Sequence, residues 1–169
     1  MGSRIRMRLA AERGFTLIEL LVVIMIIGVL AAIAYAVFIG QRDKAHDASA
    51  KDAAAALGVD VTSCFTEDDD YSKCVTADQL GEHSLRIAAV TPAGACATPP
   101  ALSPPDPYPD VPDGKVAVVA ASNDCYVIEA RSDAGHAFWS VRHADSAAVR
   151  TCAPAGLGGC AADGGWNRQ

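Results

Sequence analysis

A single carboxylate inside an apolar run is the first chemically unusual feature of this 169-residue chain. Glu19 lies within the apolar segment 15–39, and the residues 20–39 that follow it carry no charge. A carboxylate costs about 2.5–3.5 kcal/mol at the centre of a bilayer helix, so an acid in such a segment is expected to have a function. The alternative is that Glu19 reaches the nearby membrane interface and has no role.

The six cysteines are the second set of residues with distinctive chemistry. They are Cys64, Cys74, Cys96, Cys125, Cys152 and Cys160. Six cysteines allow 15 pairings, and the sequence does not choose among them. Proximity along the chain favours the pairs Cys64–Cys74 and Cys152–Cys160. The two cysteines left over would then form the pair Cys96–Cys125. A zinc site would need closer cysteine pairs with matching histidines, so we expect disulfides and an oxidising compartment.

An acidic cluster at residues 67–70 raises the question of a metal. Asp68, Asp69 and Asp70 are candidate calcium ligands, but the cluster lacks EF-hand spacing and a solvated loop is the simpler interpretation. We therefore expect no metal and no other cofactor. The sequence also lacks a nucleophile elbow, a phosphate-binding loop and an HExxH motif, so we expect no catalytic residues and no enzymatic activity.

The apolar run predicts a membrane-spanning helix over residues 15–40. Twenty uncharged residues span about 30 Å at 1.5 Å per residue, the thickness of the hydrocarbon core. Four arginines precede the run, and the basic residues that follow it are mixed with acids. This bias predicts a single-pass chain with a cytoplasmic N-terminus and the remainder outside the membrane. From residue 41 onward ten basic residues stand against eighteen acidic ones, so nucleic-acid binding is not expected.

The elements beyond the membrane segment predict an α+β fold. Residues 41–63 are rich in alanine with charges three and four residues apart, which predicts an amphipathic continuation of the helix. Residues 64–169 form an extracellular globular head stapled by disulfides. Within it we expect a Pro-rich loop at 92–114 and a β-meander at 115–142, on which the long helix packs.

The strands of this antiparallel head sheet can be placed approximately. We expect them at residues 115–121, 125–131 and 137–142, because turn residues separate these runs. A further short strand is expected at 85–90. The Gly-rich tail from residue 151 to 169 is expected to be turn-like and to wrap around a sheet edge.

Residues 13–24, Arg-Gly-Phe-Thr-Leu-Ile-Glu-Leu-Leu-Val-Val-Ile, resemble the N-terminal signal of type IV pilins and of the pseudopilins of type II secretion. The resemblance is close over about residues 10–50 and only architectural beyond. It implies that a prepilin peptidase cleaves between Gly14 and Phe15, removes residues 1–14 as a leader and N-methylates Phe15. The chain departs from many pilins in having Ala36 where they carry a helix-kinking proline.

The resemblance also implies a role for Glu19. Cleavage would create an α-amino group at Phe15 that is largely protonated at neutral pH. In lipid, a pair of opposite charges is much less costly than either charge alone. We therefore expect Glu19 of an incoming subunit to pair with the amine of a subunit already in a filament and to set the register of assembly.

These observations together predict a structural subunit of a type IV pilus-like filament, or fimbrium, in a bacterium. The expected partners are other pilin subunits in a homopolymer or mixed filament, the prepilin peptidase, an inner-membrane assembly platform, and membrane lipid before assembly. The chain would reside in the cell membrane and then in an extracellular filament. The alternatives are a pseudopilin of a type II secretion or DNA-uptake system, and a membrane-anchored extracellular binding protein that does not polymerise.

Overall fold

The computed structural model describes residues 14–81, 84–96, 108–143 and 146–166. The chain divides into two compact units, Met1–Ile39 and Gly40–Gln169, which are described separately. Helix α1, Leu17–Asp68, contributes residues to both units. It ends five residues beyond the expected boundary at residue 63, because Cys64 and Phe65 still pack against the head core.

The N-terminal unit consists, in its described part, of the first half of α1 and the three residues before it. None of its described large apolar side chains is buried; Phe15 is 77% exposed and Leu17 is 81% exposed. By length and composition, α1 is the one helix of the described chain that can cross a membrane. Ala36 lies within α1, which continues through this position.

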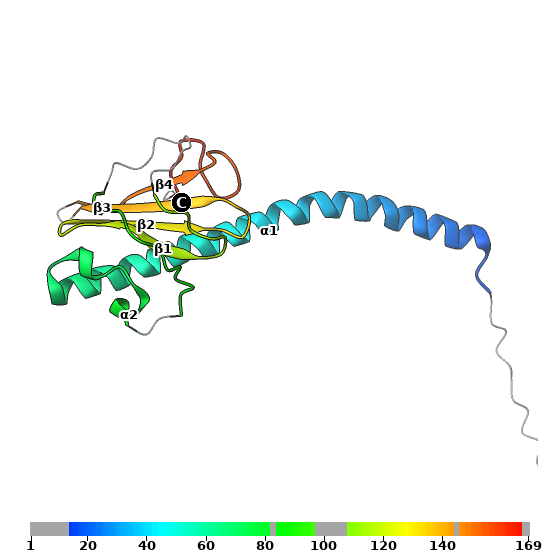
Figure 1. Cartoon of the computed structure of the whole chain (residues 1–169). Coiled ribbons are helices and arrows are strands. Elements are labelled where there is room, and N and C mark those ends of the chain that lie inside the picture. The colour runs from blue at the N-terminus through cyan, green and yellow to red at the C-terminus, as the bar shows by residue number, and fades with distance from the viewer. Residues whose placement is uncertain (1–13, 82–83, 97–107, 144–145, 167–169) are drawn as a thin grey trace, which may run out of the picture. The chain divides into compact units, whose positions relative to one another are not determined.

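The head is built on a four-stranded antiparallel sheet with the strand order β1-β2-β3-β4 (Figure 1). The strands are β1 Val116–Ala121, β2 Cys125–Arg131, β3 Ala137–His143 and β4 Val149–Ala153. The first three lie within one residue of their expected positions. Two short helical segments follow α1, a 3-10 turn η1 at Tyr71–Lys73 and α2 at Ala77–Leu80.

Two of the expectations for the head need correction. Residues 149–153 form the edge strand β4, so the expected turn-like tail begins after residue 153 and not at residue 151; the described residues 154–166 are mostly turns and bends. Residues 85–90 do not form a strand and contribute only an isolated parallel bridge between Ile87 and Val116. In both places backbone pairing with a neighbouring strand decides the structure, β3 for β4 and β1 for Ile87, and a short sequence carries little information about that pairing.

The sheet is buried on both faces. On one face Leu57 and Val61 of α1 pack against Ile128 and Phe138, and α1 lies along this face in Figure 1. On the other face Val111 belongs to a second core cluster that is built largely from the outward residues of β1, β2 and β3. All six residues of β1 are buried for this reason, so β1 shows no alternation between apolar and polar residues.

Three disulfides staple the head. The structure joins Cys64 to Cys74, Cys96 to Cys125 and Cys152 to Cys160, the pairs that proximity favours. The first closes the end of α1 onto the segment after η1. The second ties the loop before β1 to the start of β2, and the third ties β4 to the tail.

Candidate functional site

The N-terminal end of α1 brings together the residues expected to act in processing and assembly. Gly14 and Phe15 precede the helix, and Thr16 caps it. The backbone N–H of Glu19 donates to the Thr16 carbonyl oxygen at 3.1 Å and to Thr16 Oγ1 at 3.3 Å. Glu19 therefore occupies the first turn, where the helix dipole favours a negative charge. Cleavage after Gly14 would place the new amine one turn from this carboxylate.

The apolar surface that follows Glu19 is uncovered throughout. Ile24, Leu30 and Phe38 are examples, with side chains 61%, 62% and 67% exposed. An apolar surface of this extent is not stable in water, so it requires lipid or other protein helices around it. The described chain supplies neither, which makes this helix an interaction surface.

A buried carboxylate holds the tail of the head onto α1. Asp47 is 0% exposed, and His136 Nδ1 lies 2.8 Å from its Oδ2 atom. The backbone N–H of Gly159 donates to the same oxygen at 2.7 Å, and Lys51 Nζ donates to the Gly159 carbonyl oxygen. Gly158 has φ +55°, and a Cβ atom there would lie 2.0 Å from Asp47 Oδ2. The cluster is therefore a structural anchor.

This anchor was missed from the sequence. Asp47 lies in an alanine-rich helix among other charges, which is typical of a solvated helix face. Its partners are 89 and 112 residues away along the chain, so no local spacing indicates the contact. The Gly158-Gly159 pair was the only available signal, because it permits close approach of a backbone.

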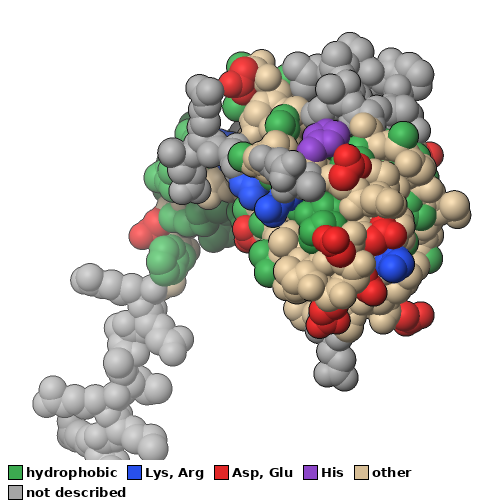
Figure 2. Space-filling model, turned by 90° about the vertical axis from the view of Figure 1, so that its left-hand side faces the viewer, with side chains coloured by type: hydrophobic (Ala, Val, Ile, Leu, Met, Phe, Trp, Pro, Cys, Tyr) green, Lys and Arg blue, Asp and Glu red, His purple; other side chains and the backbone are tan. Residues whose placement is uncertain are grey.

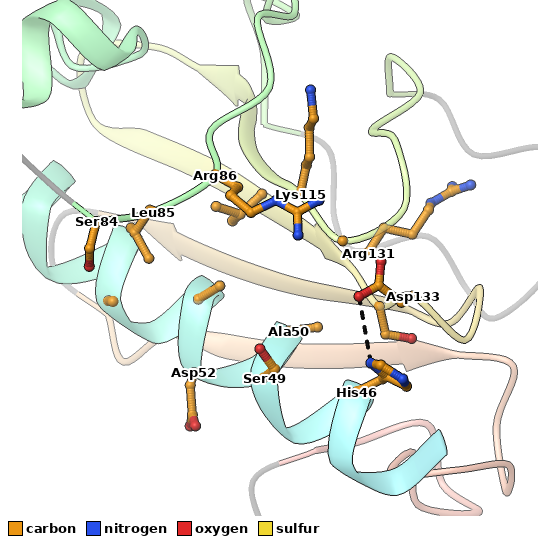
Figure 3. Close-up of a pocket in the computed structure, with 15 residues that line it drawn as sticks. His46, Ser49, Ala50, Asp52, Ser84, Leu85, Arg86, Lys115, Arg131 and Asp133 are labelled. Carbon is orange, nitrogen blue, oxygen red and sulfur yellow. Dashed lines mark ion pairs between the residues drawn. The ribbon is translucent and has the colours of Figure 1, made fainter. Parts of the chain in front are cut away.

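A groove of about 360 Å³ lies between α1, the segment 84–86 and the turn between β2 and β3 (Figure 3). In this groove His46 Nδ1 lies 3.5 Å from Asp133 Oδ2. Lys115 and Arg131 point away from α1 in Figure 3, and Arg131 pairs with the buried Glu129 at 3.2 Å. Because both basic and acidic side chains line it, the groove has no marked preference for an anion or a cation.

The acidic cluster does not converge on a cation site. Asp70 Oδ1 accepts hydrogen bonds from Ser72 Oγ at 2.6 Å and from Ser72 N at 2.9 Å, and these bonds hold the pKa of Asp70 below its ordinary value. Within the described residues, the one group with ligand-like spacing is Cys64, Asp68 and Cys74. Because the two cysteines form a disulfide, their sulfur atoms are not thiolate ligands. The calcium interpretation of Asp68, Asp69 and Asp70 therefore has no geometric support.

Comparison with known proteins bears on the N-terminal segment first. The family model described as the prokaryotic N-terminal methylation motif matches residues 9–35, which include Gly14, Phe15 and Glu19. The type IV major pilin protein PilA of Myxococcus xanthus (strain DK1622) is 36% identical over 128 residues, or 72% of this chain and 53% of that protein. This chain carries the N-terminal methylation motif and is similar to a type IV major pilin. It spans about half the length of the Myxococcus relative, and no solved structure matches it.

The α+β fold expected from the resemblance is present. The structure has a long N-terminal helix with an apolar first half, a four-stranded antiparallel sheet, and disulfides in the head. The motif match and the exposed apolar surface overlap. The matched segment 9–35 includes residues 17–35 of the exposed apolar half of α1.

Proposed function

We propose that this pilin-like chain is the structural subunit of a type IV pilus-like filament and polymerises through the apolar half of α1. The observation that carries the proposal is the exposed apolar surface of residues 17–39, most of which lies within the methylation motif matched at residues 9–35. In the membrane, lipid covers this surface. In a filament, helices of neighbouring subunits cover it, and the heads remain outside.

Processing prepares the helix for assembly. A prepilin peptidase hydrolyses the Gly14–Phe15 peptide bond, which consumes one water and leaves a carboxylate on Gly14 and an amine on Phe15. A methyl group from a cellular methyl donor then replaces one proton of that amine. The amine remains basic after methylation, so it can still carry a positive charge at neutral pH.

Glu19 supplies the complementary charge during assembly. Among neighbouring parallel helices, an unpaired carboxylate and an unpaired ammonium each carry a large desolvation cost. The subunit position that pairs Glu19 with the Phe15 amine of another subunit removes both costs at once. The pair therefore selects one axial register among the many that apolar packing alone would tolerate.

The experiment that tests this role compares two conservative acid-to-amide variants. Glu19→Gln removes the charge with almost no change in shape, and we expect at least a tenfold loss of sheared filaments with normal insertion into the membrane. Asp78→Asn, which removes an exposed acid of α2, is the matched control and is expected to assemble normally. Normal filaments from Glu19→Gln would contradict the register role.

The location follows from the same proposal. The basic leader keeps the N-terminus in the cytoplasm, and the head with its disulfides lies outside the membrane. The partners are the prepilin peptidase, an inner-membrane assembly platform and other pilin subunits. A protease added to intact cells should therefore digest exposed head epitopes before residues 17–39.

A pseudopilin of a secretion or DNA-uptake machine is the second candidate, because the same N-terminal signal serves both classes. Three disulfides suit a long-lived exposed surface and favour the pilus. Long fibres on cells that disappear when the chain is deleted would support the pilus. A secretion or uptake defect without fibres would support the pseudopilin, and an anchored monomer would show neither.

A further inference from the structure

A second groove, beside the last turns of α1, has a marked charge preference. Its volume is about 350 Å³, and none of the described residues that line it is acidic. Arg142 of β3 and Arg150 of β4 line one side. Hydroxyl groups of Thr62, Ser63 and Thr66 line the side formed by α1. We call this the arginine groove.

The register of the sheet explains why arginines lie here. Every second residue of a strand points to the same face, so one face of β3 carries Phe138, Ser140 and Arg142. On the neighbouring strand β4, Arg150 lies opposite Ser140. Phe138 belongs to the core beneath α1, whereas the other three residues line the groove. The same sheet face is therefore apolar beneath the helix and basic beside it.

Arg142 has hydrogen-bonding capacity that the described part of the head does not use. Its Nη1 atom donates to Thr62 Oγ1 over a long 3.4 Å. Its Nε atom is buried and has no hydrogen-bond partner among the described residues. The side chain as a whole is only half-buried and lines the groove, so its other guanidinium N–H groups can receive an incoming acceptor. A carboxylate fits best, because its two oxygens match the planar fork of a guanidinium.

The chain itself presents a concentrated source of carboxylates at the end of α1. Glu67, Asp68 and Asp69 are consecutive and exposed, and we call them the acidic tip. The negative end of the helix dipole adds to their charge. Figure 2 looks onto this end of the head and shows more acidic than basic side chains on it.

The spacing of the two surfaces suits contact between copies. Thr62 in the groove and Asp68 in the tip are six residues apart, which corresponds to about 9 Å along α1. A neighbour displaced along α1 by roughly that amount would present its groove at the level of the first subunit's tip. A one-way contact between two different patches leaves one patch free at each end, so it propagates into an open filament when the rotation between copies does not close a ring.

We propose that the acidic tip of one subunit docks into the arginine groove of its neighbour in the filament. The inference rests on the proposed filament function and adds a contact between heads to the contacts between N-terminal helices. It makes Arg142 the receptor for a carboxylate of the next copy. Arg150 adds positive charge to the same groove.

The first test is charge reversal in the full-length chain, with processing measured separately by mass. Arg142→Glu is expected to reduce sheared filaments at least tenfold while the processed subunit accumulates in the membrane. Adding Glu67→Arg to the same chain is expected to restore at least half of the filaments. Arg86→Glu, the same reversal at an exposed arginine of the other groove, is the control and should assemble normally.

Crosslinking tests the contact without a charge change at Arg142. All six native cysteines form disulfides, so a new pair, Glu67→Cys with Ala148→Cys, supplies the added thiols. Mild oxidation of filaments should produce a ladder of crosslinked subunits, whereas Asp163→Cys with Ala148→Cys should not. Filaments that form without a ladder, together with normal assembly of Arg142→Glu, would overturn the docking proposal alone. Absence of filaments from the unmodified chain would instead refute the proposed function.

Discussion

Replacing Asp47 with alanine should destabilise the head far more than any exposed acid-to-alanine change on α1. The carboxylate is fully buried and accepts from His136 Nδ1 and from the Gly159 backbone. Hydrogen bonds to a charged group contribute about 1.5–3 kcal/mol each, so two of them suggest a loss of about 3–5 kcal/mol. That is a large share of the 5–15 kcal/mol typical of a domain.

The assay is urea unfolding of the full-length chain in detergent with its disulfides intact, followed by a probe in the sheet such as Trp139 fluorescence. Asp52→Ala is the matched control, because Asp52 is exposed on the same helix, and its effect should stay within about 0.5 kcal/mol. A loss below about 1 kcal/mol for Asp47→Ala would refute the reasoning. It would mean that water or a rearranged tail satisfies His136 and Gly159 in the folded state.

A second variant tests whether the anchor acts through close contact. Gly158→Ala should destabilise the head, since an alanine Cβ would lie 2.0 Å from Asp47 Oδ2 and the residue has φ +55°. In the Asp47→Ala background the clash with the carboxylate disappears, while the clash with the His136 ring at 2.6 Å and the backbone strain remain. The two changes should therefore be less than additive, and strict additivity would contradict the close contact.

Three further predictions concern other parts of the head. Ser72→Ala should raise the pKa of Asp70 towards its ordinary value, because the hydroxyl of Ser72 is the main cause of its lowering; NMR titration of the Asp70 carboxyl checks this. Since folding lowers that pKa, Asp70 contributes to the stability of the folded state above its ordinary pKa, and this contribution is lost as the pH falls. We therefore expect η1 to loosen in acid. An η1 segment that stays unchanged in acid would contradict this. Replacing Cys152 and Cys160 together with serine should cost about 2–3 kcal/mol and expose the tail to protease, and a tail that stays resistant would contradict its anchoring by this disulfide.

Local features of the sequence predicted the N-terminal half of the molecule well. The charge-free run after Glu19 needs no tertiary information to be identified as a helix, and the Gly14-Phe15 junction has a specific motif around it. Strands β1 to β3 were also predictable, because turn residues separate runs rich in valine and aromatic residues.

Tertiary contacts account for what was missed. Strand β4 contains Arg150 and Thr151 and has only five residues, so pairing with β3 decides its conformation. Helix α1 continues to Asp68 because Phe65 stacks on Tyr71 at 4.0 Å and Cys64 is joined to Cys74. The burial of Asp47 depends on a tail more than 100 residues away, which no helical periodicity can reveal.

The intact mass and N-terminal sequence of the chain in sheared surface material test the central claim most directly. We predict a chain that begins at Phe15, carries one added methyl group on its amine and retains three disulfides. A chain found only in membranes and still carrying residues 1–14 would contradict processing and assembly together.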